Sequence, residues 1–477
     1  MRALAALLLV LVAAPMSEAA PPPVLQACTI GATRALCGTV TVPENRALPD
    51  GRTIGLNVAV LPATSTPVRP DPLFYIPGAD ATGALPTVAK SFATINAHRD
   101  IVFVDQRGRG GSNPLFCSPP AGFPGTLAGW VSSCIASTGA DVTHYRTVDA
   151  VDDLESVRVA LGDAAVDLYG VSYGGTIVQR YLVDHPRHVR TAIMDSASFL
   201  DVPMYERLAS NVQRALSIVH RRCLAQWACA HAYPHWYERL DQLLARLQRD
   251  PRRVIVDGQA VTVDAAAAAD AVGAMTSTAE AATSIPFTLA RAEAANLDPL
   301  AEAILQARGP DASVQARAQQ PVSVMEDEIV CTEPWAVRDW ARVGAEARGS
   351  FYRYASFMAD VATTAQVCAA WPKLDSSAEN WSRPHSLLPV LDLVGQADPV
   401  DPAPNTAGFR AAMPNGKEIV VPGQGQQVAF LGCMPSVLAR FLDAGTAKGL
   451  DTRCVSKIST PPFYVPLTEP QAPPLSG

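Results

Sequence analysis

The chain has 477 residues, 48% of them hydrophobic and 17% charged, and a formal net charge of -7. A chain of this length and apolar content can bury a sizeable core, which excludes a largely disordered protein. The acidic balance, with no dense stripe of lysine and arginine, excludes nucleic acid as an expected partner.

The N-terminus has the pattern of a secretory signal peptide, which we expect to span residues 1–19. Arg2 provides the positive charge, residues 3–14 are largely apolar, and small residues surround the expected cleavage point. The apolar stretch is too short to span a membrane, and the prolines at 21–23 would end a helix. A buried N-terminal helix is the alternative interpretation. We expect a secreted or periplasmic protein that does not contact a membrane once the signal is removed.

Ten cysteines fit an exported protein, because an even count in an oxidising compartment indicates disulfides. The cysteines fall in neighbouring twos, and closing short loops costs less chain entropy than closing long ones. A zinc site is the alternative, but the sequence has no CxxC pair and no His-Cys cluster. We expect no metal and five disulfides, which pair Cys28 with Cys37, Cys117 with Cys134, Cys223 with Cys229, Cys331 with Cys368, and Cys433 with Cys454.

Several short apolar runs have the pattern of buried parallel strands that lead into functional loops. Helical spacing separates several of them, at residues 148–157 and 177–182, and a last helix at 437–442 is ended by Gly445. Strands that alternate with helices predict an α/β protein with a mostly parallel sheet and helices on both faces. The strand-like runs are residues 72–78, 101–105, 166–170, 189–195, 388–395 and 418–422.

The alternation of strands and helices is interrupted once, between residues 199 and 385. This block is rich in Ala, Leu and Arg with helical spacing, most clearly at 264–274 and 280–306, and has few strand runs. It predicts a helical cap inserted between two strands of the sheet. We therefore expect a core built from residues 24–198 and 386–460, a cap at 199–385, and a C-terminal tail at 461–477.

Gly170-Val171-Ser172-Tyr173-Gly174 is a G-x-S-x-G pentapeptide between a strand-like run and an amphipathic helix. This is the setting of a nucleophile elbow, whose glycines permit the strained turn that raises a serine above the sheet. The N–H groups at the start of the next helix can bind a developing oxyanion. We expect Ser172 as nucleophile and Tyr173 as an oxyanion-hole residue. An ordinary Gly-rich turn is the alternative.

A triad of this kind continues along the chain with an acid and then a histidine. Asp398 follows a strand and is the expected acid, Asp195 also follows a strand and is the fallback, and either could simply cap a turn. The last histidine, His385, precedes Asp398, so no histidine remains for the third position. The expected loop for the base, after the strand at 418–422, contains Gln426.

Four motifs in this order are similar to those of the secreted prolyl and tripeptidyl aminopeptidase-like α/β-hydrolases. They are DQRGRGGS, GVSYGG, GQADPVDP and PGQGQ, accompanied by CTE, CAAWP and GCMPSVLARFLDAG over nearly the whole mature chain. The resemblance implies the α/β-hydrolase fold, a helical cap, and a Ser-Asp-His triad that releases short peptides from free N-termini. Some members cleave esters or amides instead. Carried over by position, Ser172 matches the nucleophile, Asp398 the acid, and Gln426 the histidine.

The loop after the first parallel strand departs from the family as well. The family has Gly-Gly-Pro-Gly where this chain has Gly78-Ala79-Asp80-Ala81, so Ala79 is the expected oxyanion-hole residue and Asp80 adds a negative charge nearby. Members that take free N-termini hold the substrate ammonium with cap carboxylates. The substrate-binding candidates are Glu326, Glu328 and Glu333, and solvated surface acids are the alternative.

Glutamine cannot accept the serine proton near neutral pH, and losing the histidine of a serine triad costs about 10⁶ in kcat. Two hypotheses follow: a serine hydrolase of short peptides, amides or esters with impaired turnover, or a silent pseudo-hydrolase that binds a peptide or small acyl compound. Both predict a monomer without cofactor. Cap histidines could in principle swing in, although each is more simply a surface or core residue; they are His220, His231, His235 and His385. His185 and His188, just after the elbow helix, are expected to be structural.

Overall fold

The computed structural model describes residues 25–78, 81–117, 125–203, 205–308, 322–333, 339–374 and 379–466. The expected signal peptide at 1–19 therefore lies outside the described residues. Within them, no helix combines the length and apolarity that a membrane crossing requires.

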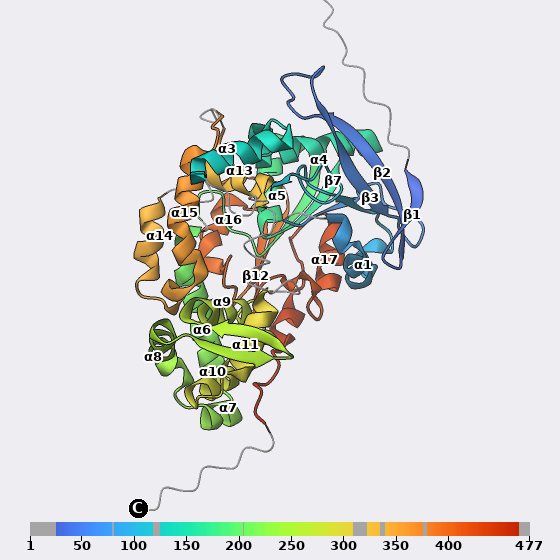
Figure 1. Ribbon diagram of the computed structural model, residues 1–477. Coiled ribbons are helices and arrows are strands. Elements are labelled where there is room, and N and C mark those ends of the chain that lie inside the picture. The colour runs from blue at the N-terminus through green and yellow to red at the C-terminus, as the bar shows by residue number, and fades with distance from the viewer. Residues whose placement is uncertain are drawn as a thin grey trace, which may run out of the picture.

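A nine-stranded sheet organises the described part of the chain (Figure 1). Its strand order is β1-β2-β3-β5-β4-β7-β8-β12-β13. The first three strands pair antiparallel, β3 pairs antiparallel with β5, and all pairs from β5 to β13 are parallel. The strands are β1 (Gln26–Ile30), β2 (Thr33–Pro43), β3 (Thr53–Leu61), β4 (Leu73–Ile76), β5 (Ile101–Val104), β7 (Val166–Val171), β8 (Val189–Asp195), β12 (Val390–Gly395) and β13 (Lys417–Val421).

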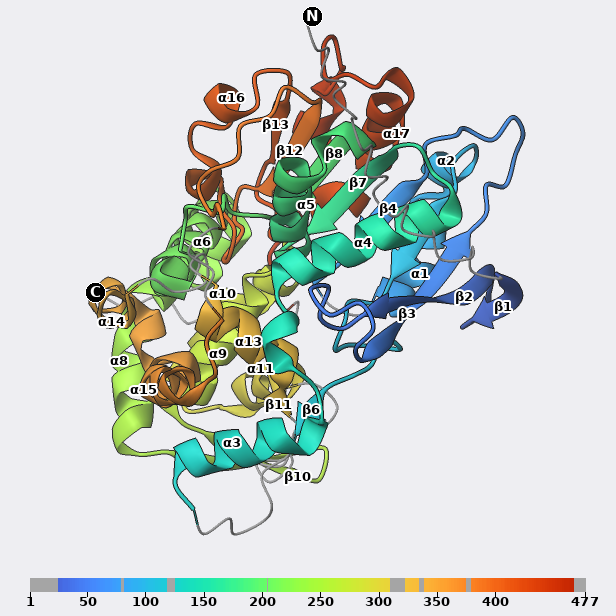
Figure 2. The ribbon, with the colours of Figure 1, turned by 90° about the horizontal axis from the view of Figure 1, so that it is seen from above.

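Helices cover both faces of the sheet, as predicted, and Figure 2 shows α4 and α5 crossing in front of the strands. One face packs against α1 (Ala81–Ser91), α2 (Ala93–Asn96) and α17 (Met434–Ala444). The other packs against α4 (Thr147–Leu161), α5 (Tyr173–Asp184) and α16 (Phe409–Ala412). In α4 the apolar spacing explains the contact, because Val151, Leu154 and Val157 lie on one side of the helix and are buried. Gly445 ends α17 with a φ of 63°, as its position in the sequence predicts.

The chain between β8 and β12 forms a lobe with its own apolar core (Figure 1). The lobe also holds an antiparallel hairpin of β9 (Arg252–Val256) and β10 (Gln259–Val263), which was not predicted from the sequence. Its helices are α6 (Leu208–Leu224), α7 (Trp227–Ala232), α8 (Trp236–Arg249), α9 (Ala265–Met275), α10 (Ile285–Glu293), α11 (Asp298–Arg308), α13 (Val324–Thr332), α14 (Trp340–Ala347) and α15 (Ser356–Ala370).

Segments from outside the 199–385 block also pack onto this lobe. β6 (Phe116–Cys117) pairs with β11 (Val322–Ser323), and α3 (Leu127–Thr138) lies beside α15 (Figure 2). Phe463, from the C-terminal tail, is buried in the core of the lobe. Segments that precede and follow the 199–385 block in the sequence therefore pack against the lobe.

Five disulfides join the cysteines in the predicted neighbouring pairs, and none of the ten is free. Cys28–Cys37 links β1 to β2, and Cys331–Cys368 links α13 to α15. Disulfides constrain the unfolded chain and persist in oxidising compartments.

Candidate active site

Ser172 stands at the sharp turn between β7 and α5 with φ 52° and ψ -122°. This is a strained conformation for a residue with a side chain. Its glycine neighbours allow the turn, because a Cβ on Gly174 would lie 1.8 Å from the carbonyl oxygen of Ile76. A Cβ on Gly170 would lie 2.2 Å from the oxygen of Gly174. The G-x-S-x-G spacing is thus required by close backbone approach.

The elbow places Ser172, which is only partly buried, at the carboxyl ends of the parallel strands. Its N–H donates to the carbonyl of Asp195 at 3.0 Å, which fixes the turn against β8. Tyr173 begins α5, so its N–H is among the first-turn donors that a helix leaves without an intrahelical partner. Gly78 lies close to Tyr173, whereas Ala79, the other expected oxyanion-hole residue, and Asp80 lie outside the described residues.

The phenol hydroxyl of Tyr173 connects the start of α5 to neighbouring segments by hydrogen bonds. Gln106 donates to its oxygen at 3.1 Å, and Thr147 Oγ1 lies 2.7 Å from it. Thr147 also donates through its N–H and its hydroxyl to Glu333, which follows α13. The DQRGRGGS motif, which contains Gln106, therefore supports the elbow, and Glu333 joins the lobe to it.

Asp398 lies on the loop after β12 and is fully buried. Its Oδ1 accepts the N–H groups of Val400 and Asp401, both at 2.8 Å. Its Oδ2 has no hydrogen-bond partner among the described residues. Burial raises the pKa of Asp398, although these N–H donors and the Ser196 hydroxyl oppose the shift. One carboxylate oxygen is thus anchored by two N–H groups, while the other has no well-aligned partner among the described residues.

Asp195, the fallback acid, is also fully buried, but its oxygens are occupied. They accept the Tyr169 hydroxyl at 2.7 Å and the N–H groups of Val428 and Ala429, each at 3.0 Å. Burial raises the pKa of Asp195 to about 6. The Asp195 side chain therefore links the loop after β13 to β8, which is a structural role.

Gln426 lies on that loop and is fixed through its backbone. Its N–H donates to Ser277 O of the lobe at 2.9 Å. The next residue, Gln427, adopts φ 58° and donates its N–H to Ser196 Oγ at 2.9 Å. The acid loop is bound to the same segment, because Ala397 N donates to Gln424 O at 2.7 Å. The structure thus brings the loops of Asp398 and Gln426 together beside the strand end that carries Asp195.

Comparisons with known proteins match two parts of the chain, one with the elbow and one with the acid loop. Residues 72–217, which include the elbow, match the sequence model described as "alpha/beta hydrolase fold", and residues 354–454, which include the acid loop and Gln426, match "TAP-like protein". The chain has the α/β-hydrolase fold and is similar to the aminopeptidase-like α/β-hydrolases. The predicted fold is confirmed.

Individual relatives of this α/β-hydrolase match about a third of the chain. A tripeptidyl aminopeptidase of Streptomyces coelicolor is 32% identical over 186 residues, which are 34% of this chain and 34% of the relative. The serine protease Hip1 of Mycobacterium tuberculosis is 28% identical over 188 residues, 34% of this chain and 36% of the relative. The chain thus spans about a third of the length of the curated relatives it matches. A crystal structure of proline iminopeptidase from Mycobacterium smegmatis aligns with 85% of this chain and 98% of its own, at 16% identity and a TM-score of 0.35.

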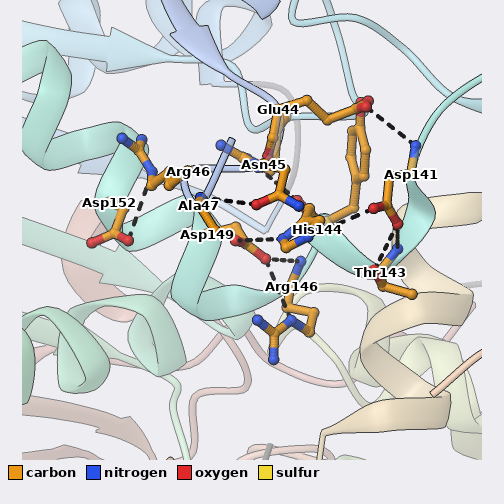
Figure 3. Close-up of polar contacts among 12 residues, drawn as sticks. Glu44, Asn45, Arg46, Ala47, Asp141, Thr143, His144, Arg146, Asp149 and Asp152 are labelled. Atoms are coloured by element: carbon orange, nitrogen blue, oxygen red, sulfur yellow. Dashed lines mark hydrogen bonds and ion pairs between the residues drawn. The ribbon is translucent and has the colours of Figure 1, made fainter. Parts of the chain in front are cut away.

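The histidines of the α/β-hydrolase, all of them within the described residues, have their contacts away from the elbow. His144 lies between Asp141 and Asp149, at 3.7 Å from each carboxylate (Figure 3), and the nearby Asp149 carboxylate raises its pKa. In the lobe, His220 stacks on Tyr237, His231 stacks on Trp227, and His235 precedes α8. The others are His185 beside Asp152, His188 beside Glu155, His98 beside Pro67, and His385 in a surface groove with Leu387.

The three candidate carboxylates at α13 have different surroundings. Glu326 is exposed and forms an ion pair with Arg109 at 3.1 Å, as a surface acid does. Glu328 is buried, accepts the indole N–H of Trp371, and has its pKa raised by burial to about 7. Glu333 is buried and reaches the elbow through Thr147. Glu333 is thus the one of the three with a hydrogen-bonded path to the site.

Two further residues belong to this region, although the sequence analysis does not single them out. Ser277 fixes Gln426 from the lobe, and no local pattern marks it. Asp401 is buried three residues after Asp398. The second acid in the Asp-Pro-Val-Asp-Pro run is a signal that could have found it.

Asp392, in β12, leads to a prediction about pH. It is fully buried near Glu418, Asp195 and Asp401, and burial raises its pKa well above the usual range. The folded chain therefore keeps a proton that the unfolded chain loses above about pH 4, so this group's contribution to stability falls as pH rises toward the folded pKa.

The Asp392→Asn variant should lose that slope. We expect the free energy of unfolding of the variant, relative to native, to increase by roughly 1–3 kcal/mol between pH 5 and pH 7. Urea unfolding of both proteins at the two pH values measures the difference. If the free energies of unfolding of the variant and the native protein differ by the same amount at pH 5 and pH 7, Asp392 is already ionised in the folded protein.

Proposed function

We propose that this chain is a secreted serine hydrolase of the aminopeptidase-like α/β-hydrolases, acting through an acyl-enzyme on short peptides, amides or esters. The observation that carries the proposal is Ser172 at a strained strand-to-helix turn, with the loops of Asp398 and Gln426 joined beside it. The exported location is supported by the five disulfides.

The proposed chemistry begins with attack of Ser172 Oγ on the substrate carbonyl carbon. The oxyanion that forms would accept hydrogen bonds from Tyr173 N–H and Ala79 N–H, which stabilise charge as it develops. Asp398 offers an unpaired carboxylate oxygen of the kind that orients a histidine base. Gln426 stands where that base belongs and cannot take a proton, so the proposed turnover is slow.

The proposed substrate class is a short peptide or amide with a free N-terminus. The names of the curated relatives, tripeptidyl aminopeptidase and serine protease, support it. The substrate-binding candidates Glu326, Glu328 and Glu333 remain proposals, and Glu333 is the one of them linked to the elbow by hydrogen bonds through Thr147. The lobe, predicted as a cap at residues 199–385, would cover the site.

The second candidate function is a silent pseudo-hydrolase that keeps the site as a binding module for a peptide or small acyl compound. Gln426 favours it, because an amide in the base position leaves the nucleophile without its usual activation. Fold membership does not decide between the two, since function depends on the site.

The test compares the native mature protein with its Ser172→Ala variant on a panel of aminoacyl and tripeptidyl p-nitroanilides and p-nitrophenyl esters. A serine hydrolase gives slow turnover that the variant loses. Equal rates for the two proteins, combined with saturable binding of a panel compound, would assign the chain to the binding-module class.

A further inference from the structure

A small cavity lies directly beside Ser172, on the side of the acid loop. Ser172, Thr176, Ser198, Leu200 and Asp401 are among the residues that line it. The cavity offers about 10 Å³ to the centre of a water molecule, which is room for about one water. The nucleophile and a buried carboxyl group thus border the same space.

Asp401 lines this space, and one of its two side-chain oxygens has no well-aligned hydrogen-bond partner among the described residues. The residue is 2% exposed. Its Oδ1 accepts the Ser198 hydroxyl at 2.7 Å, and that hydroxyl in turn accepts Asn405 Nδ2 at 2.9 Å. Its Oδ2 has no well-aligned hydrogen-bond partner among the described residues, although the Ser198 N–H also acts on this carboxyl. A buried polar atom of this kind calls for an explanation, and a water in the adjoining cavity would provide one.

We propose that Asp401 is the proton acceptor for Ser172, acting through one water in this cavity in place of the missing histidine. The inference rests on the proposed hydrolase function. Carboxylates serve as general bases in enzymes, directly or through one water. This role would give the native chain a slow but specific reaction at Ser172.

The proton and electron movements balance without a further reactant. Ser172 Oγ gives its proton to the water as it bonds to the carbonyl carbon, the water passes a proton to Asp401, and the carbonyl π electrons move to oxygen. When the intermediate collapses, the bond to the leaving amine or alkoxide breaks, and the proton returns from Asp401 through the water to that group. A second water then repeats the sequence to release the acid.

The charges around Asp401 favour a proton acceptor that works at mildly alkaline pH. Burial and the neighbouring Asp398 raise the pKa of Asp401 to about 8. Asp392 is also close enough to interact with it, whereas Arg214 acts on Asp398 and opposes the rise there. Asp401 is thus ionised above about pH 8, so the reaction should speed up as pH rises to that point.

The test is the rate at which p-nitrophenyl acetate acylates Ser172, measured as p-nitrophenol release from pH 5 to pH 9.5. We expect the native rate to rise toward a plateau above about pH 8 and the Asp401→Asn variant to lose about 10²-fold at the plateau. Asp392→Asn is the matched control, because it makes the same change in another buried carboxyl that does not line the cavity. It should keep the native plateau rate. Thermal melting checks that each variant is folded.

The same substitution made in the Gln426→His variant distinguishes failure of this inference from failure of the proposed function. In Gln426→His, imidazole can take the proton, so adding Asp401→Asn should change the rate less than about threefold. If Asp401→Asn leaves the native rate unchanged while Ser172→Ala abolishes it, the chain is a hydrolase and Asp401 is not its proton acceptor. If native and Ser172→Ala react equally, both the inference and the native hydrolase activity are overturned.

Discussion

The Gln426→His variant should hydrolyse aminoacyl and tripeptidyl p-nitroanilides at least about 10³-fold faster than the native chain, in kcat/KM. The physical reason is that a glutamine amide cannot remove the Ser172 proton, whereas an imidazole can. Loss of the histidine from a serine triad costs about 10⁶ in kcat, and a grafted histidine should recover a substantial part of that. Asp398, with one free carboxylate oxygen, is available to orient the new ring.

Matched controls identify the source of the gain. Gln427→His places the same side chain one residue further on, where the backbone is left-handed, and should give no comparable gain. Gln426→His combined with Ser172→Ala should return to background. A pH–rate profile with a transition near the usual histidine pKa of about 6.5 would mark imidazole as the base. A Gln426→His rate equal to native would show that position 426 is not the base position.

The Asp195→Ala variant should lose about 3–5 kcal/mol of stability. Three buried donors, the Tyr169 hydroxyl and the N–H groups of Val428 and Ala429, would lose their acceptor, and each such loss costs about 1–3 kcal/mol. Removal of a buried carboxyl whose pKa is raised to about 6 offsets a part of this. Urea unfolding near neutral pH measures the change.

Asp201→Ala provides the comparison for Asp195→Ala. Asp201 forms a partly exposed ion pair with Arg383 at 3.2 Å, and such pairs contribute about 0–1 kcal/mol. A loss below about 1 kcal/mol in Asp195→Ala would mean that Asp195 does not anchor the loop, and would reopen its assignment as the triad acid.

The parallel half of the fold could be predicted from the sequence because its strands are buried on both faces. β4 and β5 are continuous apolar runs, and β7 and β12 are apolar runs interrupted by one buried aspartate each, so the sequence pattern reveals all four. The antiparallel strands were not predicted, because they are not buried on both faces. β2 alternates exposed, intermediate and buried positions, and β9 begins with two exposed arginines, so neither forms an apolar run.

The site could be predicted only where the chain itself carries a local signal. The elbow glycines, the acid loop and the Gln426 loop each lie in a short motif at a strand end, and the structure brings these motifs together. Contacts made across the fold had no such signal. Ser277 binds Gln426 from a distant helix end, and Asp195 binds a loop more than two hundred residues away, so only the tertiary structure defines their roles.

The site and the rate of covalent labelling by a fluorophosphonate show whether Ser172 is a nucleophile that lacks its usual base. Mass spectrometry of native protein and Gln426→His, sampled over time, gives both quantities. We expect one adduct, on Ser172, that forms at least about 10²-fold faster in Gln426→His than in native protein. An adduct on another residue, or equal rates in the two proteins, would contradict the account.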